Sequence, residues 1–393
     1  MGDAPAQPRV ERAGPIRATV AGNKLELVDR GERRLEALLA LIRGATKSLR
    51  LLFYIFEPDA TGTRVRDELV EAAKRGVRVR LLLDGFGSAN AKAAFFQPIA
   101  AESGDFCLFH PSYGRRYLLR NHQKLAIADE RVAIIGGANI HDDYMTDEGV
   151  RHWRDLWLRL EGPEVARAAS YFDSLYRWTT TEGAKLRNLR RLVFRHTDYE
   201  GPLQWKFSRP LSMRNPWPTS FAHDIQAASR VDIISAYFSP PRSVLRRIGR
   251  AARKARVRVI TAGKSDNHAT VAAARYNFGR MLRRGVEMYE YQAARLHTKL
   301  VIADDIVHIG SANFDLRSFY INLEIMLRVE DAAFASAMRG YFERELADSE
   351  RITSEIHQRR GTLLARFQWM VSHWLVTSMD YTVTRRLNFR RER

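Results

Sequence analysis

Short runs of nearly continuous hydrophobic residues alternate with amphipathic stretches along the first part of the chain. The segment KSLRLLFYIF (47–56) predicts a buried strand, and residues 65–75 predict a helix that ends at Gly76. A second apolar run, VRVRLLLDG (77–85), predicts the next strand. Because both predicted strands are nearly continuously apolar, we expect a sheet covered by helices on both faces.

The second half of the chain repeats this order of elements. VDIISAYFSPP (231–241) and VRVITAG (257–263) predict strands, and SVLRRIGRAARKA (243–255) between them predicts an amphipathic helix. We therefore expect an α/β protein of two similar units, each a mixed β-sheet flanked by helices, related by a pseudo-twofold axis. The expected parts are a first unit at 1–180, a connecting segment at 181–222, a second unit at 223–350 and a C-terminal extension at 351–393.

Each unit carries one copy of an eight-residue motif, HQKLAIAD (122–129) in the first and HTKLVIAD (297–304) in the second. In an extended strand, the histidine and the lysine two residues later share a face, whereas the aspartate lies at odd spacing and faces away. The residues expected at the chemistry are His122, Lys124, His297 and Lys299. Asp129 and Asp304 are expected to hold a turn.

Each motif continues into an apolar strand and a turn of small residues, VAIIGGAN (132–139) and IVHIGSAN (306–313). The turn positions are Gly136, Gly137, Gly310 and Ser311, and the turns end at Asn139 and Asn313. Farther on, Asp155 and Glu324 are single acids in apolar strands, and a buried acid needs a partner. A histidine ring nitrogen on the neighbouring strand is the expected partner. One such motif arises easily by chance, but two complete copies indicate a shared catalytic site.

The net charge and the cysteine content limit which partners and which metal sites the protein can have. The net charge is +19 and the pI about 10.3, which calls for an anionic partner, either nucleic acid or an anionic membrane. The single cysteine, Cys107, excludes an intramolecular disulfide and a cysteine-based zinc site. The N-terminal residues lack the apolar run of a signal peptide or anchor, so we expect a cytoplasmic protein.

These motifs resemble those of the phospholipase D superfamily, whose mark is HxKx4D followed by G-[GS]-x-N. Within it, YIFEPDATG (54–62), WRD (153–155), YFSPP (237–241) and GSANFDLRSFYINLE (310–324) are similar to the bacterial cardiolipin synthases. The resemblance spans roughly residues 40–350. Because the chain lacks N-terminal spanning helices, it looks more like the shorter, peripherally associated synthases.

Two histidines facing one cavity, surrounded by lysines and asparagines, suit a phosphodiester site that uses no metal and no cofactor. Lysine and asparagine donors can stabilise charge on the phosphorus, and Asp155 and Glu324 can orient the rings. The resemblance implies that His122 is the nucleophile, giving a phosphohistidine, and that His297 is the general acid. The residues alone leave that order open.

The resemblance further implies a phosphatidyltransferase that moves a phosphatidyl group from one phospholipid to the head-group alcohol of another, with phosphatidylglycerol and phosphatidylethanolamine as the expected substrates. It also implies that the protein works peripherally on the cytoplasmic side of the cell membrane. Which lipid is donor and which is acceptor stays open. The alternative is a phosphodiesterase of the same superfamily that hydrolyses phospholipid or nucleic acid. Nucleic acid is the less favoured substrate, because the related nucleases resemble one half of this chain and obtain two histidines by dimerising. A non-catalytic binding protein fits poorly with two complete motifs.

The C-terminal stretch GTLLARFQWMVSHWLVTSM (361–379) has apolar residues at helical spacing and precedes TRRLNFRRER. An apolar face with tryptophans beside arginines suits a helix lying on an anionic bilayer. The residues expected at the membrane are Phe367, Trp369, Trp374, Arg385 and Arg386. A helix packed on the core fits the same spacing.

Overall fold

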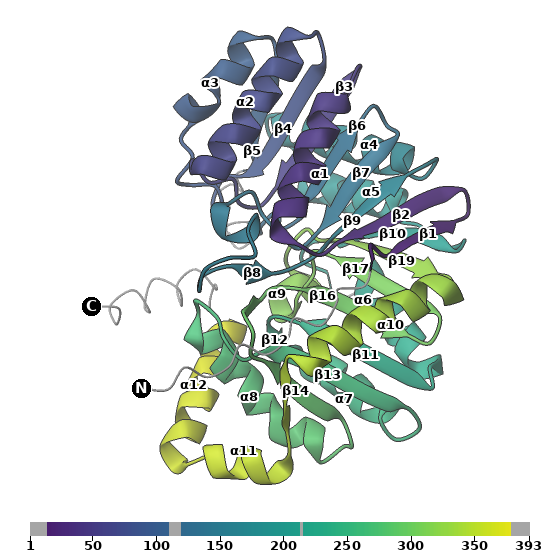
Figure 1. Cartoon of the computed structure of the whole chain (residues 1–393), viewed down its shortest axis with the longest axis vertical. Coiled ribbons are helices and arrows are strands. Elements are labelled where there is room, and N and C mark those ends of the chain that lie inside the picture. Colours follow the sequence, from purple (N-terminus) through teal and green to yellow (C-terminus); the bar gives the residue numbers. More distant parts are fainter. Residues whose placement is uncertain (1–13, 110–118, 213–214, 379–393) are drawn as a thin grey trace.

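The computed structural model describes residues 14–109, 119–212 and 215–378 and consists of two α/β units stacked along the long axis of the molecule (Figure 1). The first unit, purple to teal in Figure 1, lies above the second, which runs from teal to yellow. Each unit is built on an eight-stranded sheet.

The first unit contains the elements β1 (Arg17–Val20), β2 (Asn23–Val28), α1 (Gly31–Gly44), β3 (Ser48–Phe53), α2 (Ala60–Lys74), β4 (Arg78–Asp84), α3 (Ala93–Ala101), β5 (Asp105–Phe109), β6 (Leu125–Ala128), β7 (Val132–Gly136), η2 (Asp142–Tyr144), β8 (Trp153–Arg154), β9 (Trp157–Glu161), α4 (Val165–Thr180) and α5 (Leu186–His196). Its sheet has the order β1-β2-β9-β7-β6-β3-β4-β5. Strands β3, β4 and β5 run parallel, and the other neighbours are antiparallel.

The second unit contains β10 (Leu203–Phe207), α6 (Pro216–Ala227), β11 (Arg230–Ser235), β12 (Phe238–Ser239), α7 (Arg242–Ala251), β13 (Arg256–Ala262), α8 (His268–Leu282), β14 (Glu287–Tyr291), β15 (Arg295–Leu296), β16 (Lys299–Ala303), β17 (Ile306–Gly310), β18 (Phe314–Asp315), α9 (Leu316–Tyr320), β19 (Ile325–Glu330), α10 (Ala332–Ala347), β20 (Ser349–Ile352), α11 (Ser354–Arg360) and α12 (Leu363–Ser378). Its sheet has the order β10-β19-β17-β16-β11-β13-β14-β20, with β11, β13 and β14 parallel. The two orders match from β2 and β10 at one side to β5 and β14 at the other. The prediction of an α/β protein with two similar mixed-sheet units is confirmed.

The helices occupy equivalent places in the two units. Helices α1, α2 and α3 pack on the outer face of the first sheet, and α6, α7 and α8 pack on the outer face of the second. Helices α4 and α10 cover the opposite faces. All six residues of β3 are buried, as expected for a strand covered on both faces. Helix α2 ends at Lys74, and Gly76 follows with a φ of 84°, the left-handed conformation that glycine favours.

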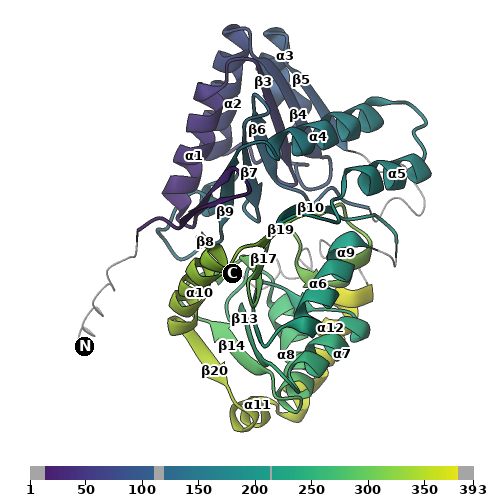
Figure 2. The same ribbon diagram turned by 90° about the vertical axis from the view of Figure 1, so that its right-hand side faces the viewer.

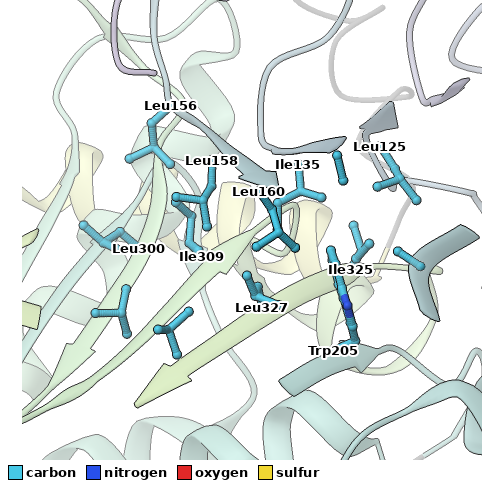
Figure 3. Packing of buried hydrophobic residues seen from close by; sticks show 14 of the residues in the cluster. Leu125, Ile135, Leu156, Leu158, Leu160, Trp205, Leu300, Ile309, Ile325 and Leu327 are labelled. Carbon is cyan, nitrogen blue, oxygen red and sulfur yellow. The ribbon is translucent and has the colours of Figure 1, made fainter. Parts of the chain in front are cut away.

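One hydrophobic core joins the two units. Figure 3 shows side chains of the first sheet, among them Ile135 and Leu158, beside side chains of the second, among them Ile309 and Leu327. These side chains are fully buried. Because the shared core fixes the units relative to each other, groups from both can form a site with defined geometry.

The segment expected to connect the units, 181–222, is largely structured. It contains α5, β10 and the start of α6, and β10 pairs with β19 as an edge strand of the second sheet. Trp205 and Trp217 are fully buried. Helix α4 ends at Thr180, so we propose a boundary there, with the second unit's sheet beginning at Leu203 rather than after residue 222.

Candidate active site

Backbone hydrogen bonds between the units position both motif histidines. The His122 N–H donates to the Leu323 carbonyl at 2.9 Å, and the His297 N–H donates to the Arg154 carbonyl at 2.8 Å. Strand β15, directly before His297, pairs in parallel with β8 of the first unit. Both histidines lie just before their strands, because β6 begins at Leu125 and β16 at Lys299. The two motifs therefore meet at the junction of the units.

Each histidine contacts the acid of the other unit. His122 Nδ1 lies 3.0 Å from Glu324 Oε2, and His297 Nδ1 lies 2.6 Å from Asp155 Oδ2. A histidine on a neighbouring strand was the expected partner of each acid. In both cases the histidine belongs to the opposite unit and lies just before its strand. Because each carboxylate occupies Nδ1, the Nε2 atom of each ring is the one available to a substrate.

Burial sets the protonation of this site. Burial lowers the pKa of His122 to about 4 and that of His297 to about 3, although the paired carboxylates oppose the shift. Burial would raise the pKa of Asp155 and Glu324, but the neighbouring lysines and histidines hold both pKa values below the ordinary range. Both rings are therefore neutral, and both carboxyls ionised, at neutral pH.

The motif lysines are buried beside their histidines. Lys124 Nζ donates to the His122 carbonyl at 2.6 Å, and Lys299 Nζ lies 2.7 Å from His297 Nδ1. Burial lowers the pKa of Lys124 to about 7 and that of Lys299 to about 8. Among the described residues, no group of three or more His, Cys, Asp and Glu side chains is arranged to hold a metal ion.

These pKa values predict that an anion binds with uptake of protons. An anion raises the pKa of nearby lysines and histidines, so its affinity should fall as the pH rises through 7 and 8, where the free lysines lose their protons. Calorimetry with inorganic phosphate, in buffers of different ionisation enthalpy, should report net proton uptake. Proton release, or an affinity independent of pH, would contradict this arrangement.

The two asparagines have different surroundings. Asn139 Oδ1 accepts a hydrogen bond from the Ile55 N–H at 3.2 Å. Asn313 Oδ1 is buried and has no hydrogen-bond partner within the described ranges. Both side chains are nearly inaccessible.

The motif aspartates hold the hairpin turns. Asp129 accepts hydrogen bonds from the N–H groups of Thr46, Lys47 and Ser48 at 2.7–2.8 Å. Asp304 accepts from the N–H groups of Ser229 and Arg230 at 2.9 Å. Each aspartate has a left-handed φ, 54° at Asp129 and 46° at Asp304, and ties its hairpin to the start of the adjacent antiparallel strand, β3 in the first unit and β11 in the second.

The turns after β7 and β17 differ at one position. A Cβ atom at Gly137 would lie 2.6 Å from both carboxylate oxygens of Asp155. At the corresponding position, Ser311 Oγ donates to Glu324 Oε2 at 2.5 Å. At Gly136 and Gly310 a Cβ atom would collide with the backbone carbonyls of Leu156 and Ile325. Aspartate at position 155 therefore requires the glycine at 137, whereas glutamate at position 324 is hydrogen-bonded by the serine at 311.

We expect Gly137→Ser to disrupt the pairing of Asp155 with His297. The added side chain would push Asp155 away from His297, at a cost of about 1–3 kcal/mol in the free energy of unfolding. The melting temperature and kcat should both fall. Ser311→Gly, which removes the hydrogen bond to Glu324 and the one from the Ile325 N–H but introduces no collision, should be the milder change. The reverse order would show that the turn at Gly137 accommodates a side chain beside Asp155.

Several aromatic residues around the histidines were not assigned a role from the sequence. The ring centroids of Tyr54 and His122 are 4.9 Å apart, and those of Tyr237 and His297 are 6.1 Å apart. Tyr144 and Trp153 lie 5.1 and 5.4 Å from His297. The recurrence of Tyr54 and Tyr237 just after equivalent strands, β3 and β11, was the signal that could have identified the first two.

The C-terminal helix α12 packs on α8 and separates the predicted membrane residues. Phe367 and Trp374 are each 59% exposed. Trp369 is buried and stacks on His357 with ring centroids 5.2 Å apart, so its assignment to a membrane-facing surface is corrected. The helix has apolar residues on two faces, and spacing alone did not distinguish them. Arg385 and Arg386 lie outside the described residues, and no helix within the described ranges has the length and hydropathy to cross a bilayer.

Comparisons with known proteins agree with this architecture. Residues 38–176 and 223–346 match a family described as "Cardiolipin synthase, PLD-like domain". The chain is 30% identical over 370 residues to "Cardiolipin synthase 1" of Bacillus cereus, covering 88% of this chain and 72% of that protein. It is 30% identical over 364 residues to a cardiolipin synthase of Listeria monocytogenes, covering 90% of this chain and 75% of that protein.

Solved structures with the same fold are more distant in sequence. The crystal structure of phosphatidylserine synthase from Haemophilus influenzae matches with a TM-score of 0.72 at 15% identity, covering 93% of this chain and 97% of that chain. Polyphosphate kinase from Porphyromonas gingivalis matches with a TM-score of 0.56 at 13% identity, covering 94% of this chain and 58% of that chain. These two likenesses concern the fold alone. From the family match and the relatives in sequence, the chain belongs to the phospholipase D superfamily and, within it, to the cardiolipin synthase-type proteins with PLD-like domains.

Proposed function

We propose that the chain is a cardiolipin synthase-type phosphatidyltransferase, which moves a phosphatidyl group from one phospholipid to the head-group alcohol of another. The observation that carries this proposal is the crossed pairing of His122 with Glu324 and of His297 with Asp155. The pairing joins two histidine–carboxylate pairs at one junction, and a two-step transfer needs one ring to form a bond to phosphorus and another to handle the proton.

In the first step, Nε2 of neutral His122 attacks the phosphorus of the donor lipid. The bond from phosphorus to the head-group oxygen breaks, and His297 donates its Nε2 proton to the leaving alcohol. The product is a phosphatidyl-histidine at His122. The low pKa of His122 in the free protein keeps the nucleophile unprotonated. The substrate phosphate and Asp155 both favour the protonated form of His297 in the complex.

In the second step, neutral His297 removes the proton from a hydroxyl of the acceptor head group. That oxygen attacks the phosphorus, the N–P bond breaks, and His122 returns to its neutral state. One phosphodiester replaces another, so no nucleotide is consumed. Lys124 and Lys299 would stabilise the charge on the non-bridging oxygens.

We also propose phosphatidylglycerol as the acceptor, with phosphatidylglycerol or phosphatidylethanolamine as the donor. A water-insoluble substrate implies work at a membrane surface, and we place the protein peripherally on the cytoplasmic side. The exposed side chains of Phe367 and Trp374 on α12 support contact with lipid.

Product analysis tests this function. The protein should be incubated with vesicles of phosphatidylglycerol, with and without phosphatidylethanolamine, and separately with DNA. Cardiolipin together with free glycerol, formed equally in the presence of EDTA, is the expected result. Phosphatidic acid without cardiolipin, or cleaved DNA, would instead identify a hydrolase.

A further inference from the structure

The outer helices of the second unit form a continuous layer that α12 extends. Helix α7 packs beside α6, and α12 packs along α8. Figure 2 shows these helices on the same side of the second sheet. Arg284, just after α8, donates a hydrogen bond to the Leu245 carbonyl of α7, and His373 of α12 stacks on Tyr276 of α8 at 4.6 Å. We call the outward surface of α7, α8 and α12 the second-unit flank.

Helix α7 and the turn after it present only positive charge. The chain has no acidic residue from 233 to 265. Six basic side chains here are exposed, and none forms an ion pair with an acid of the described residues: Arg242, Arg246, Arg247, Arg250, Arg253 and Lys254. Such an uncompensated row of cations raises the electrostatic energy of the folded protein unless it meets an anionic partner.

The equivalent helix of the first unit provides an internal comparison. Helix α2 occupies the same place in the βαβ crossover, but its charges are mixed and paired. Arg66 contacts Asp67 at 2.6 Å, and Lys74 contacts Glu71 at 2.8 Å. The fold therefore does not require a basic helix at this place, and the charge of α7 is a separate feature of the second unit.

Helix α12 adds an apolar strip to the same flank. Five large apolar side chains of α12 are exposed by 45–90%: Leu363, Leu364, Phe367, Met370 and Trp374. Trp369 and Ser372, on the other side, are buried. A helix that lies in the headgroup region of a bilayer combines an apolar face with nearby cations. A nucleic-acid surface also uses cations, but it has no use for a strip of exposed leucine, methionine and phenylalanine.

The second-unit flank lies next to the candidate active site. Both α8 and α12 contact β12, the two-residue strand that directly follows Tyr237. The Tyr237 ring in turn lies 6.1 Å from the His297 ring. A membrane held against this flank would therefore lie near the half of the site that contains His297.

We propose that the second-unit flank is the surface by which the protein docks on an anionic phospholipid bilayer, with the apolar strip of α12 in the interface and the arginines of α7 against the headgroups. This inference rests on the proposed function, since a lipid substrate is what brings the protein to a membrane. The first unit does not take part in docking, so the two similar halves are presented unequally to the bilayer.

Vesicle sedimentation tests the proposal. The variants Arg246→Gln/Arg247→Gln/Arg250→Gln on α7 and Arg33→Gln/Arg64→Gln/Lys74→Gln on α1 and α2 remove the same charge from equivalent layers. Both are made in the His297→Ala protein so that lipid is not consumed. On vesicles of phosphatidylcholine with phosphatidylglycerol, the α7 variant should bind on the order of 100-fold more weakly, and the α1/α2 variant should lose less than about threefold.

A third variant, Phe367→Ser/Trp374→Ser, examines the apolar strip. Its binding to the same vesicles should fall at least about tenfold, with an unchanged melting temperature because both side chains are largely exposed in the folded protein. Equal losses in the α7 and α1/α2 variants would overturn the proposal. So would unchanged vesicle binding by the α7 variant, or loss of DNA binding by that variant with vesicle binding retained.

The same substitutions in the protein with His297 intact separate this inference from the proposed function. On a dispersed short-chain phosphatidylglycerol, the α7 variant should keep the turnover of the unchanged protein. If the unchanged protein does not turn this lipid over, the proposed function fails and the vesicle result stands by itself. If turnover is normal but the α7 variant binds vesicles fully, only the docking surface is wrong.

Discussion

Alanine at His122 or at His297 is expected to lower kcat for phosphatidyl transfer by about 10,000-fold or more. The first substitution removes the atom that bonds to phosphorus, and the second removes the proton donor and acceptor. Each ring is held at Nδ1 by a carboxylate of the other unit, 3.0 Å away for His122 and 2.6 Å away for His297. Because each ring is fixed in its own place, neither histidine can take over the role of the other. Turnover of phosphatidylglycerol, measured by release of glycerol, provides the readout.

His223→Ala is the matched control, since the His223 side chain is 84% exposed and distant in sequence from both motifs. It should keep full activity. The double variant His122→Ala/His297→Ala should be hardly less active than either single variant, because the two rings act as one unit. A single variant that retains a tenth of the activity would show that one of the histidines is not part of the reaction.

Neutral replacement of the acids is expected to have the next largest effect. Asp155→Asn and Glu324→Gln keep the shape of each side chain but remove the charge that orients and stabilises a protonated ring. By analogy with other histidine–carboxylate pairs, kcat should fall about 100- to 10,000-fold. The fold should remain, because the amides can still make hydrogen bonds in the buried site.

The crossed geometry makes these two substitutions separable. Asp155→Asn should change the ring N–H resonance of His297 in a proton NMR spectrum and leave that of His122, while Glu324→Gln should do the opposite. The pKa of the affected ring should fall further, because each carboxylate raises the pKa of its partner. An effect of Asp155→Asn on His122 alone would contradict the pairing across units.

The duplicated fold was predictable because the strands and helices of each unit have clear local sequence patterns. Strands such as β3 and β11 are rich in apolar residues and almost entirely buried, and in the first unit a glycine follows the helix between the strands. The odd spacing of Asp129 and Asp304 likewise pointed to the turns in which both residues lie. The edge strand β10 was less visible, because LQWKF lies among arginines and prolines and its pairing with β19 is set by the tertiary fold.

The pairing of each acid with the histidine of the other unit could not be predicted from the sequence. Periodicity tells which residues of a strand share a face, but Asp155 and His297 are joined by the parallel pairing of β8 with β15, two residues long. The two faces of α12 posed a similar difficulty, since Trp369 and Phe367 fit the same apolar helix. Only packing against α8 and α11 decides which one is buried.

The most direct test of transfer through His122 is to trap the covalent intermediate. The His297→Ala variant should be mixed with a phosphatidyl ester of p-nitrophenol, whose leaving group needs no proton, and denatured at alkaline pH, where N–P bonds survive. Mass spectrometry of its peptides should find a phosphatidyl group on His122, and the His122→Ala variant should carry none. A phosphatidyl group on any other residue, or release of p-nitrophenol in steady turnover with none on His122, would contradict transfer through this histidine.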